Sequence, residues 1–558
     1  MAVWRVVRPG GPRAVGAAWF GSALLIAAAA LLPIVSLAWI AAGADGGHWR
    51  HLVDHVLPVA LSNTVVLLCG VALIVTAVGT ACAWLVTAYD FPGRRTLGWA
   101  LLLPLAMPTY IVAYVYLDML HPIGPVQGAI RWLLGYDSPR QFRLPDLRSM
   151  GGAIVLMGCV LYPYVYLTMR ALFASQSRRL LEAARTLGEG RWGAFRRVAW
   201  PLARPALAVG LSLALLETLN DIGASEFLGI NTLTVSIYST WVTRSDLAAA
   251  AQIACAMLVA VAGLMVLEAH GRRHQRFGNT RNQDGMTPIR LQGAWAWGAT
   301  VATAIPVVLG FVAPAAYLVV DVVQRLASGQ HLTVNLYNGL RNSVGLALGV
   351  SALVVAGGLV VAWTDRRISA ASPPSTWLTR AASVGYAVPG SVLAIGLLAP
   401  GLAIDRAWAW LTDAPGLPLM NFGAILVGAC CIRFMAMSAG SIGAGLSRIA
   451  PEIEQSARLL GETHVGTLRR VHLPLLRPAI AVAALLVFVD AMKELPVTLL
   501  LRPMNFDTLA TVLYGEAARG AYEEGALAAL AIVLAGLLPV VWLARTQFTS
   551  HSPRKPAS

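Results

Sequence analysis

Long apolar segments alternate with short polar segments along the whole chain of 558 residues. A helix that crosses a lipid bilayer needs about 20 mostly apolar residues. Each half of the chain offers six such segments, and we expect each of them to be a transmembrane helix. They lie near residues 15–42, 58–88, 97–120, 150–174, 203–227, 246–268, 294–322, 338–363, 377–400, 420–445, 478–500 and 524–545. The pattern therefore predicts an all-α polytopic membrane protein with about twelve transmembrane helices.

The charged residues agree with this prediction and indicate a topology. Only 12% of the residues are charged, whereas a soluble globular chain carries roughly 25%. A net charge of +15 also occurs in proteins that bind nucleic acid, but here the arginines cluster at the ends of apolar segments. The positive-inside rule places the clusters at 178–204 and 448–477, and both termini, in the cytoplasm. We therefore expect this chain to lie in a lipid bilayer and to bind no nucleic acid.

One polar, arginine-rich segment occurs twice, at residues 182–206 and 455–479. The two copies align without a gap at an offset of 273, which matches Gly188 with Gly461 and Pro201 with Pro474. Six predicted spans separate the copies, so both face the same side and the halves are parallel repeats. We expect a first repeat at 1–268, a polar cytoplasmic linker at 269–293 and a second repeat at 294–558.

Each copy is predicted to form two short helices joined at the glycine. Glycine can adopt the positive φ that turns the chain at a helix end, and the proline then marks the entry into the next span. A surface helix of this kind either lies among lipid headgroups or docks in a groove of another protein. The physical pattern leaves both alternatives open.

The sequence of these loops resembles the signature motif of binding-protein-dependent ABC importer permeases of the MetI-like type. The first copy matches the whole motif, and the second copy differs from the motif at its first two residues. The matching residues are Glu182, Ala183, Ala184, Gly188 and Pro201 in the first copy, and Gln455, Ser456, Ala457, Gly461 and Pro474 in the second. The resemblance implies that both loops are coupling helices that seat in an ATPase subunit. It also implies two parallel six-helix repeats.

Three further segments, at 103–114, 219–234 and 493–511, look like the fused permeases of ferric iron importers. The resemblance implies a multi-pass protein of the bacterial cytoplasmic (inner) membrane. Its expected partners are two copies of an ATPase subunit and a soluble substrate-binding protein, periplasmic or lipid-anchored. Thiamine, polyamine and sulfate permeases share this architecture and remain alternatives. A membrane-embedded enzyme or receptor is the alternative from another class.

We expect no enzymatic activity and no cofactor bound by this chain. A phosphate-binding loop needs the pattern G-x-x-x-x-G-K-[ST], and the only two lysines, Lys493 and Lys555, do not lie in one. The partner subunit is therefore expected to use the ATP.

Ionisable residues gather in the fifth and eleventh predicted spans, where each costs roughly 2.5–3.5 kcal/mol to insert. They are Glu217, Asp221 and Glu226 in the fifth, and Asp490, Lys493 and Glu494 in the eleventh. The offset of 273 pairs Glu217 with Asp490 and Asp221 with Glu494. The i, i+4 spacing predicts one acidic helix face in each repeat, lining a cation pathway. Alternatively, these residues lie at the outer interface and Lys493 pairs with Glu494.

Two outer loops carry further candidates. His48, His51, Asp54 and His55 have spacings that place them on one helix face, which suits a metal ion or an amphipathic helix at the interface. The loop at 121–149 carries several arginines. We expect it to be either the docking site of the soluble binding protein or a loop that binds lipid headgroups.

Overall fold

The computed structural model describes residues 17–43, 49–50, 52–175, 186, 188, 190, 193, 195–272, 288–328, 334–371, 377–413, 418–421 and 423–549. The chain forms two compact units that draw on both sequence halves. Unit 1 comprises residues 1–44, 245–255 and 338–508, and unit 2 comprises residues 45–244, 256–337 and 509–558. The opening helix of each sequence half therefore belongs to the unit that holds most of the other half.

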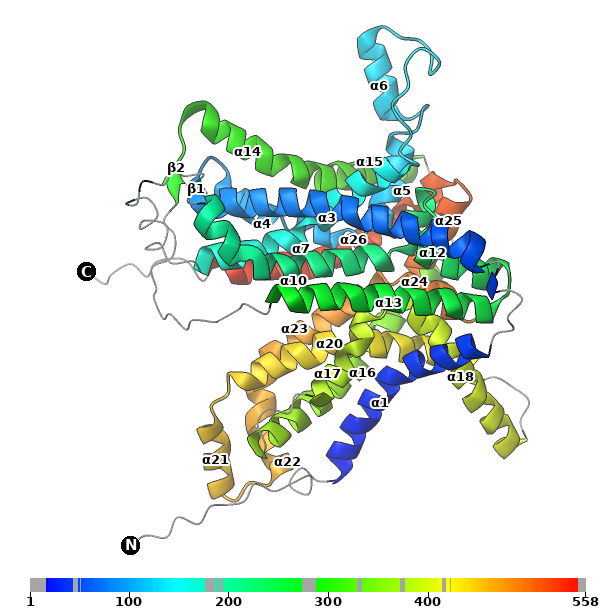
Figure 1. Cartoon of the computed structure of the whole chain (residues 1–558), viewed down its shortest axis with the longest axis vertical. Helices are drawn as coiled ribbons and strands as arrows, with labels where there is room; N and C mark the ends of the chain where they lie inside the picture. Colours follow the sequence, from blue (N-terminus) through cyan, green and yellow to red (C-terminus); the bar gives the residue numbers. More distant parts are fainter. Residues whose placement is uncertain are drawn as a thin grey trace. The chain divides into compact units, whose positions relative to one another are not determined.

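Unit 2 is a helix bundle with one short parallel strand pair (Figure 1). Long helices α3 and α7 pack along each other, and glycines allow close approach: a Cβ on Gly79 would lie 2.8 Å from Val165. The elements are η2 (Leu52–Val56), α3 (Leu57–Ala88), β1 (Tyr89–Asp90), α4 (Arg94–Ala100), η3 (Leu103–Ala106), α5 (Thr109–Met119), α6 (Pro125–Leu134), α7 (Met150–Ser175), η4 (Phe195–Ala199), α10 (Trp200–Asn220), α11 (Ile222–Phe227), α12 (Leu233–Tyr238), η5 (Ser239–Thr243), β2 (Ile289–Arg290), α14 (Gly293–Val307), η6 (Val308–Val312), α15 (Ala313–Ala327), α25 (Leu509–Ala518) and α26 (Tyr522–Thr549).

Unit 1 is built around α16, α20 and α23, whose side chains form a buried cluster that includes Trp363, Ile442 and Leu476. Helix α1 packs against α17 and α18. The elements are α1 (Ala17–Ala42), α17 (Trp377–Ala387), α18 (Gly390–Thr412), α19 (Pro418–Asn421), α20 (Ala424–Ser447), α21 (Pro451–Leu459), α22 (His464–Thr467), η7 (Leu468–His472), α23 (Leu473–Met492) and α24 (Pro496–Leu501). Two helices, α13 (Leu247–Arg272) and α16 (Val334–Ala371), contain residues of both units.

The predicted number of spans is confirmed. Eleven helices among the described residues are long and apolar enough to cross a membrane. A twelfth span is added if the bent pair Arg94–Ala106 and Thr109–Met119, which meet at 92°, counts as one. The fold is therefore the predicted all-α polytopic membrane protein.

The third and fifth spans of each half are broken, although the sequence predicted continuous helices. The third spans break before the matched prolines Pro108 (ψ 144°) and Pro389 (ψ 143°), because proline lacks the N–H that a continuous helix needs. The fifth span of the first half ends at Asn220 and resumes at Ile222. Its counterpart ends at Met492 and resumes at Pro496. Both halves thus interrupt the same helices.

An asparagine at matching positions of the two halves also forms a similar hydrogen bond in each unit. Asn63 donates a hydrogen bond to the carbonyl of Asn231 at 3.2 Å in unit 2. Asn342 donates one to the carbonyl of Asp507 at 2.9 Å in unit 1. Both contacts tie the second span of a half to the segment that follows its broken fifth span.

Candidate functional site

The second repeated loop is a helix, a glycine turn and a second helix, as predicted. Helix α21 ends in a Schellman motif: Gly461 donates its N–H to the carbonyl of Arg458 at 3.0 Å, and Glu462 donates to that of Ala457 at 3.1 Å. Gly461 has φ +86° and its repeat mate Gly188 has φ +88°, so the predicted left-handed turn is confirmed in both copies. Thr463 then caps α22 by accepting the N–H of Gly466 at 3.1 Å.

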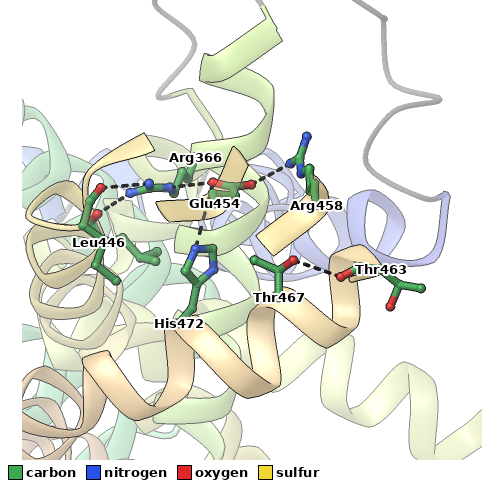
Figure 2. A network of polar contacts seen from close by, with 8 residues as sticks. Arg366, Leu446, Glu454, Arg458, Thr463, Thr467 and His472 are labelled. Carbon is green, nitrogen blue, oxygen red and sulfur yellow. Dashed lines mark hydrogen bonds and ion pairs between the residues drawn. The ribbon is translucent and has the colours of Figure 1, made fainter. Parts of the chain in front are cut away.

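Glu454 connects this loop to other helices of its unit through polar contacts (Figure 2). Its carboxylate lies 2.6 Å from Arg458 of the same helix, 3.5 Å from Nε of Arg366 on α16, and 4.0 Å from Nε2 of the buried His472. Arg366 also donates to the carbonyls of Leu446 and Ile449, at the end of α20. The ion pair with Arg366 therefore links α21 to α16 and, through the hydrogen bonds of Arg366, to the end of α20. The imidazole of His472 on η7 lies close by but makes no hydrogen bond among the described residues.

The outward side of the same loop is apolar. Leu459 and Leu460 are 88% and 86% exposed, next to the turn at Gly461. Gln455 and Ser456 are also exposed, and Ala457 is buried. In the first copy, Glu182, Ala183 and Ala184 lie outside the described residues. Pro201 is the second residue of α10, as Pro474 is of α23. The described copy thus combines a fixed inner side with an exposed leucine pair.

At the break of the fifth span, Asp221 has a capping role in unit 2. One carboxylate oxygen accepts the N–H of Ala224 at 2.9 Å and so caps α11. The other accepts the hydroxyl of Thr109, the first residue of α5. The break of the fifth span therefore meets the break of the third span at a buried carboxylate.

Its repeat mate Glu494 occupies the equivalent place in unit 1. Its carboxylate accepts the N–H of Val497 at 3.1 Å and lies 3.2 Å from Nε of the buried Arg433 on α20. Gly390, the counterpart of Thr109, lies alongside, since a Cβ there would be 2.5 Å from the Arg433 guanidinium and 3.1 Å from Glu494. A hydroxyl in unit 2 is thus replaced in unit 1 by an arginine and the glycine that makes room for it.

These contacts correct two interpretations. The predicted single helix face is wrong, because α10 ends at Asn220 and α23 at Met492, before Asp221 and Glu494. The pairing of Lys493 with Glu494 is replaced by an ion pair with Asp490, with Nζ 2.7 Å from the carboxylate. The other acids stay within the helices: Glu217 is half-buried on α10, and Glu226 accepts a hydrogen bond from the Tyr514 hydroxyl at 2.5 Å.

The histidine candidates lie mostly beyond the described part of the chain. His48 and His51 are outside it, and Asp54 and His55 are exposed on η2. Within the described ranges no group of three or more His, Cys, Asp or Glu side chains is placed to hold a metal ion. The metal site in this loop stays a prediction.

A family model decides the class of the chain. The model of the binding-protein-dependent transport system inner membrane component matches it twice, at residues 76–276 and 354–547. The chain belongs to this family. The two matches correspond to the two sequence repeats, so one chain carries two permease modules.

Similar proteins differ in the cargo that their names state. The "Fe(3+)-transport system permease protein FbpB 2" of Haemophilus influenzae is 25% identical over 88% of this chain and 90% of its own. The "Sulfate transport system permease protein CysT" of Escherichia coli is 29% identical over 46% of this chain and 91% of its own. A chain of a crystallised bacterial alginate ABC transporter has a TM-score of 0.36 at 17% identity, over 45% of this chain and 93% of its own.

This protein is therefore a multi-pass transport permease, and its relatives are transport proteins. Three residues at the breaks were missed from sequence: Arg433, Thr109 and Tyr514. The first had a visible signal, since Arg433 is the only charge inside the apolar segment 420–445. The other two gave none, because hydroxyl residues are common in transmembrane helices and only the fold brings them to carboxylates.

Proposed function

We propose that this chain is the membrane permease of a ferric iron importer. The observation that carries the proposal is the likeness to the Haemophilus influenzae iron permease, which extends over 88% of this chain and 90% of that one. The sulfate permease, in contrast, aligns with 46% of this chain. A likeness along the full length includes both repeats and the broken spans of each.

The chemistry of the broken spans supports a cationic cargo. Non-helical backbone at membrane depth is tolerated where it is buried in protein or lines a cavity, and discontinuous helices hold substrate sites in other transporters. Here the breaks and their surroundings carry the carboxylates of Asp221, Glu226 and Glu494. Carboxylate and phenol oxygens, such as those of Glu226 and Tyr514, suit a hard cation. In this proposal these acids, with Glu217 and Asp490, serve the pathway.

The repeated loops supply the link to ATP. Each loop docks on one copy of a separate ATPase subunit, with Leu459 and Leu460 as the apolar contact of the second loop. Buried contacts at the centre of an interface carry most of its energy, and two adjacent exposed leucines suit that position. A soluble binding protein delivers the iron on the other side. Both termini are cytoplasmic in this arrangement.

The test is uptake by proteoliposomes that contain the permease, its ATPase and its binding protein. We expect ATP-dependent accumulation of radioactive ferric iron and none of sulfate, thiamine or polyamine. Accumulation of sulfate instead would contradict the iron proposal and leave the permease class standing. Replacing Glu226 by Gln should lower iron uptake, with Glu268→Gln, another acid of the same unit near the end of α13, as the control.

A further inference from the structure

Helix α6 (Pro125–Leu134) carries its polar side chains inward and its apolar side chains outward. Gln127 and Arg131, one turn apart, are only 2% and 7% exposed. On the other side, Trp132 and Leu133 are 82% and 77% exposed. Ile123, just before the helix, is 79% exposed. A helix surrounded by water would place its polar side chains outward and its apolar side chains inward. The exposed apolar surface of α6 therefore indicates contact with an apolar neighbour.

The inward side chains hold the helix firmly in this orientation. The Gln127 amide donates to the carbonyl of Leu120 at 2.7 Å and accepts the N–H of Leu144 at 3.1 Å. The loop after the helix is closed by the stacked rings of Tyr136 and Phe142, whose centroids are 6.1 Å apart. The exposed apolar side is therefore a fixed feature of the loop.

The direction of α6 points to the bilayer as that neighbour. In Figure 1 the helix runs crosswise to α3, α7 and α10 of its own unit and projects sideways beyond them. Those three helices lie in candidate membrane spans, so a helix crosswise to them lies along the membrane surface. Tryptophan, tyrosine and arginine are the residues that gather at that boundary. The segment from 121 to 149 supplies all three, with four arginines against two aspartates.

We propose that α6 is an interfacial helix that rests in the membrane surface on Ile123, Trp132 and Leu133. This assigns the loop at 121–149 to the bilayer and not to the soluble binding protein. It is independent of the cargo and of the ATPase.

The test measures membrane depth in phosphatidylglycerol vesicles, using the full chain with its six cysteines replaced and one nitroxide label. A label at Leu133→Cys should be reached by oxygen and shielded from a water-soluble nickel reagent. A label at Arg140→Cys, an exposed polar position of the same loop, should show the reverse. If the label at 133 is open to the nickel reagent in vesicles, the proposal is wrong. Shielding that appears only after a binding protein is added would assign the loop to that protein instead.

Discussion

At the residue scale, the ion pair between Arg433 and Glu494 is the contact whose removal we expect to cost most. The two side chains are 10% and 5% exposed. Glu494→Gln keeps an oxygen for the N–H of Val497 but leaves a buried guanidinium without its carboxylate, a loss of about 3–5 kcal/mol. The thermal unfolding midpoint of the purified chain should fall markedly.

The double variant Arg433→Leu with Glu494→Gln should recover much of this loss, because it removes both buried charges. Asp490→Asn, on α23 just before the break, is the matched control. Its ion pair with Lys493 is more exposed, and such pairs contribute about 0–1 kcal/mol. A double variant less stable than Glu494→Gln would show that the charge pair is not what stabilises the break.

A second prediction at this scale concerns the glycine turn. Gly461→Pro should abolish ATP-driven uptake while the chain still inserts, because proline cannot adopt φ +86° and has no N–H for the carbonyl of Arg458. Gly461→Asn should retain most uptake, since asparagine tolerates the left-handed conformation. The same two changes at Gly188 show whether uptake depends on the first loop as it does on the second. Full uptake by both proline variants would reject the coupling role.

Single residues show how far sequence reasoning reaches. The positive φ of Gly188 and Gly461 followed from a repeated glycine between two helical stretches, because few other residues adopt that conformation. The partners of Asp221 and Glu494 did not follow, because Thr109 and Arg433 lie far away in sequence and only tertiary packing joins them. Local conformation was predictable, and long-range pairing was not.

At the scale of elements, α21 is predicted to depend on Glu454 for its position. Glu454→Gln should remove the ion pair with Arg366, in which both side chains are less than a fifth exposed, and lower ATP-driven uptake severalfold, because an ion pair shielded from water is stronger than an exposed one. Glu462→Gln is the control in the same loop. It loses only an ion pair with Arg470, which is 77% exposed, and should transport nearly normally. If the two variants behave alike, the network in Figure 2 does not position the loop.

The helices themselves were largely predictable, and their interruptions were not. Apolar length alone located the spans. The breaks depend on single residues within apolar runs, such as Pro108 and Pro389, which in a membrane helix are compatible with either a continuous or a broken course. The asymmetry between Thr109 and Gly390 at the breaks has no sequence signal until their neighbours are known.

At the scale of the whole molecule, the chain contains two family modules, whereas the sulfate permease aligns with 46% of the chain over 91% of its own length. We therefore predict that a single copy supplies the complete membrane part of the importer. Its two loops then recruit two ATPase subunits, although the second loop begins Gln455-Ser456 where the first has Glu182-Ala183.

The most direct test of this account is the mass of the intact complex, purified with its ATPase and measured by native mass spectrometry. The account predicts one copy of this 59.0 kDa chain with two copies of the ATPase. Gly461→Pro should yield complexes with a single ATPase copy. Two copies of this chain in each complex, or a complex with one ATPase from the unchanged protein, would contradict the claim that one chain carries both halves of the permease.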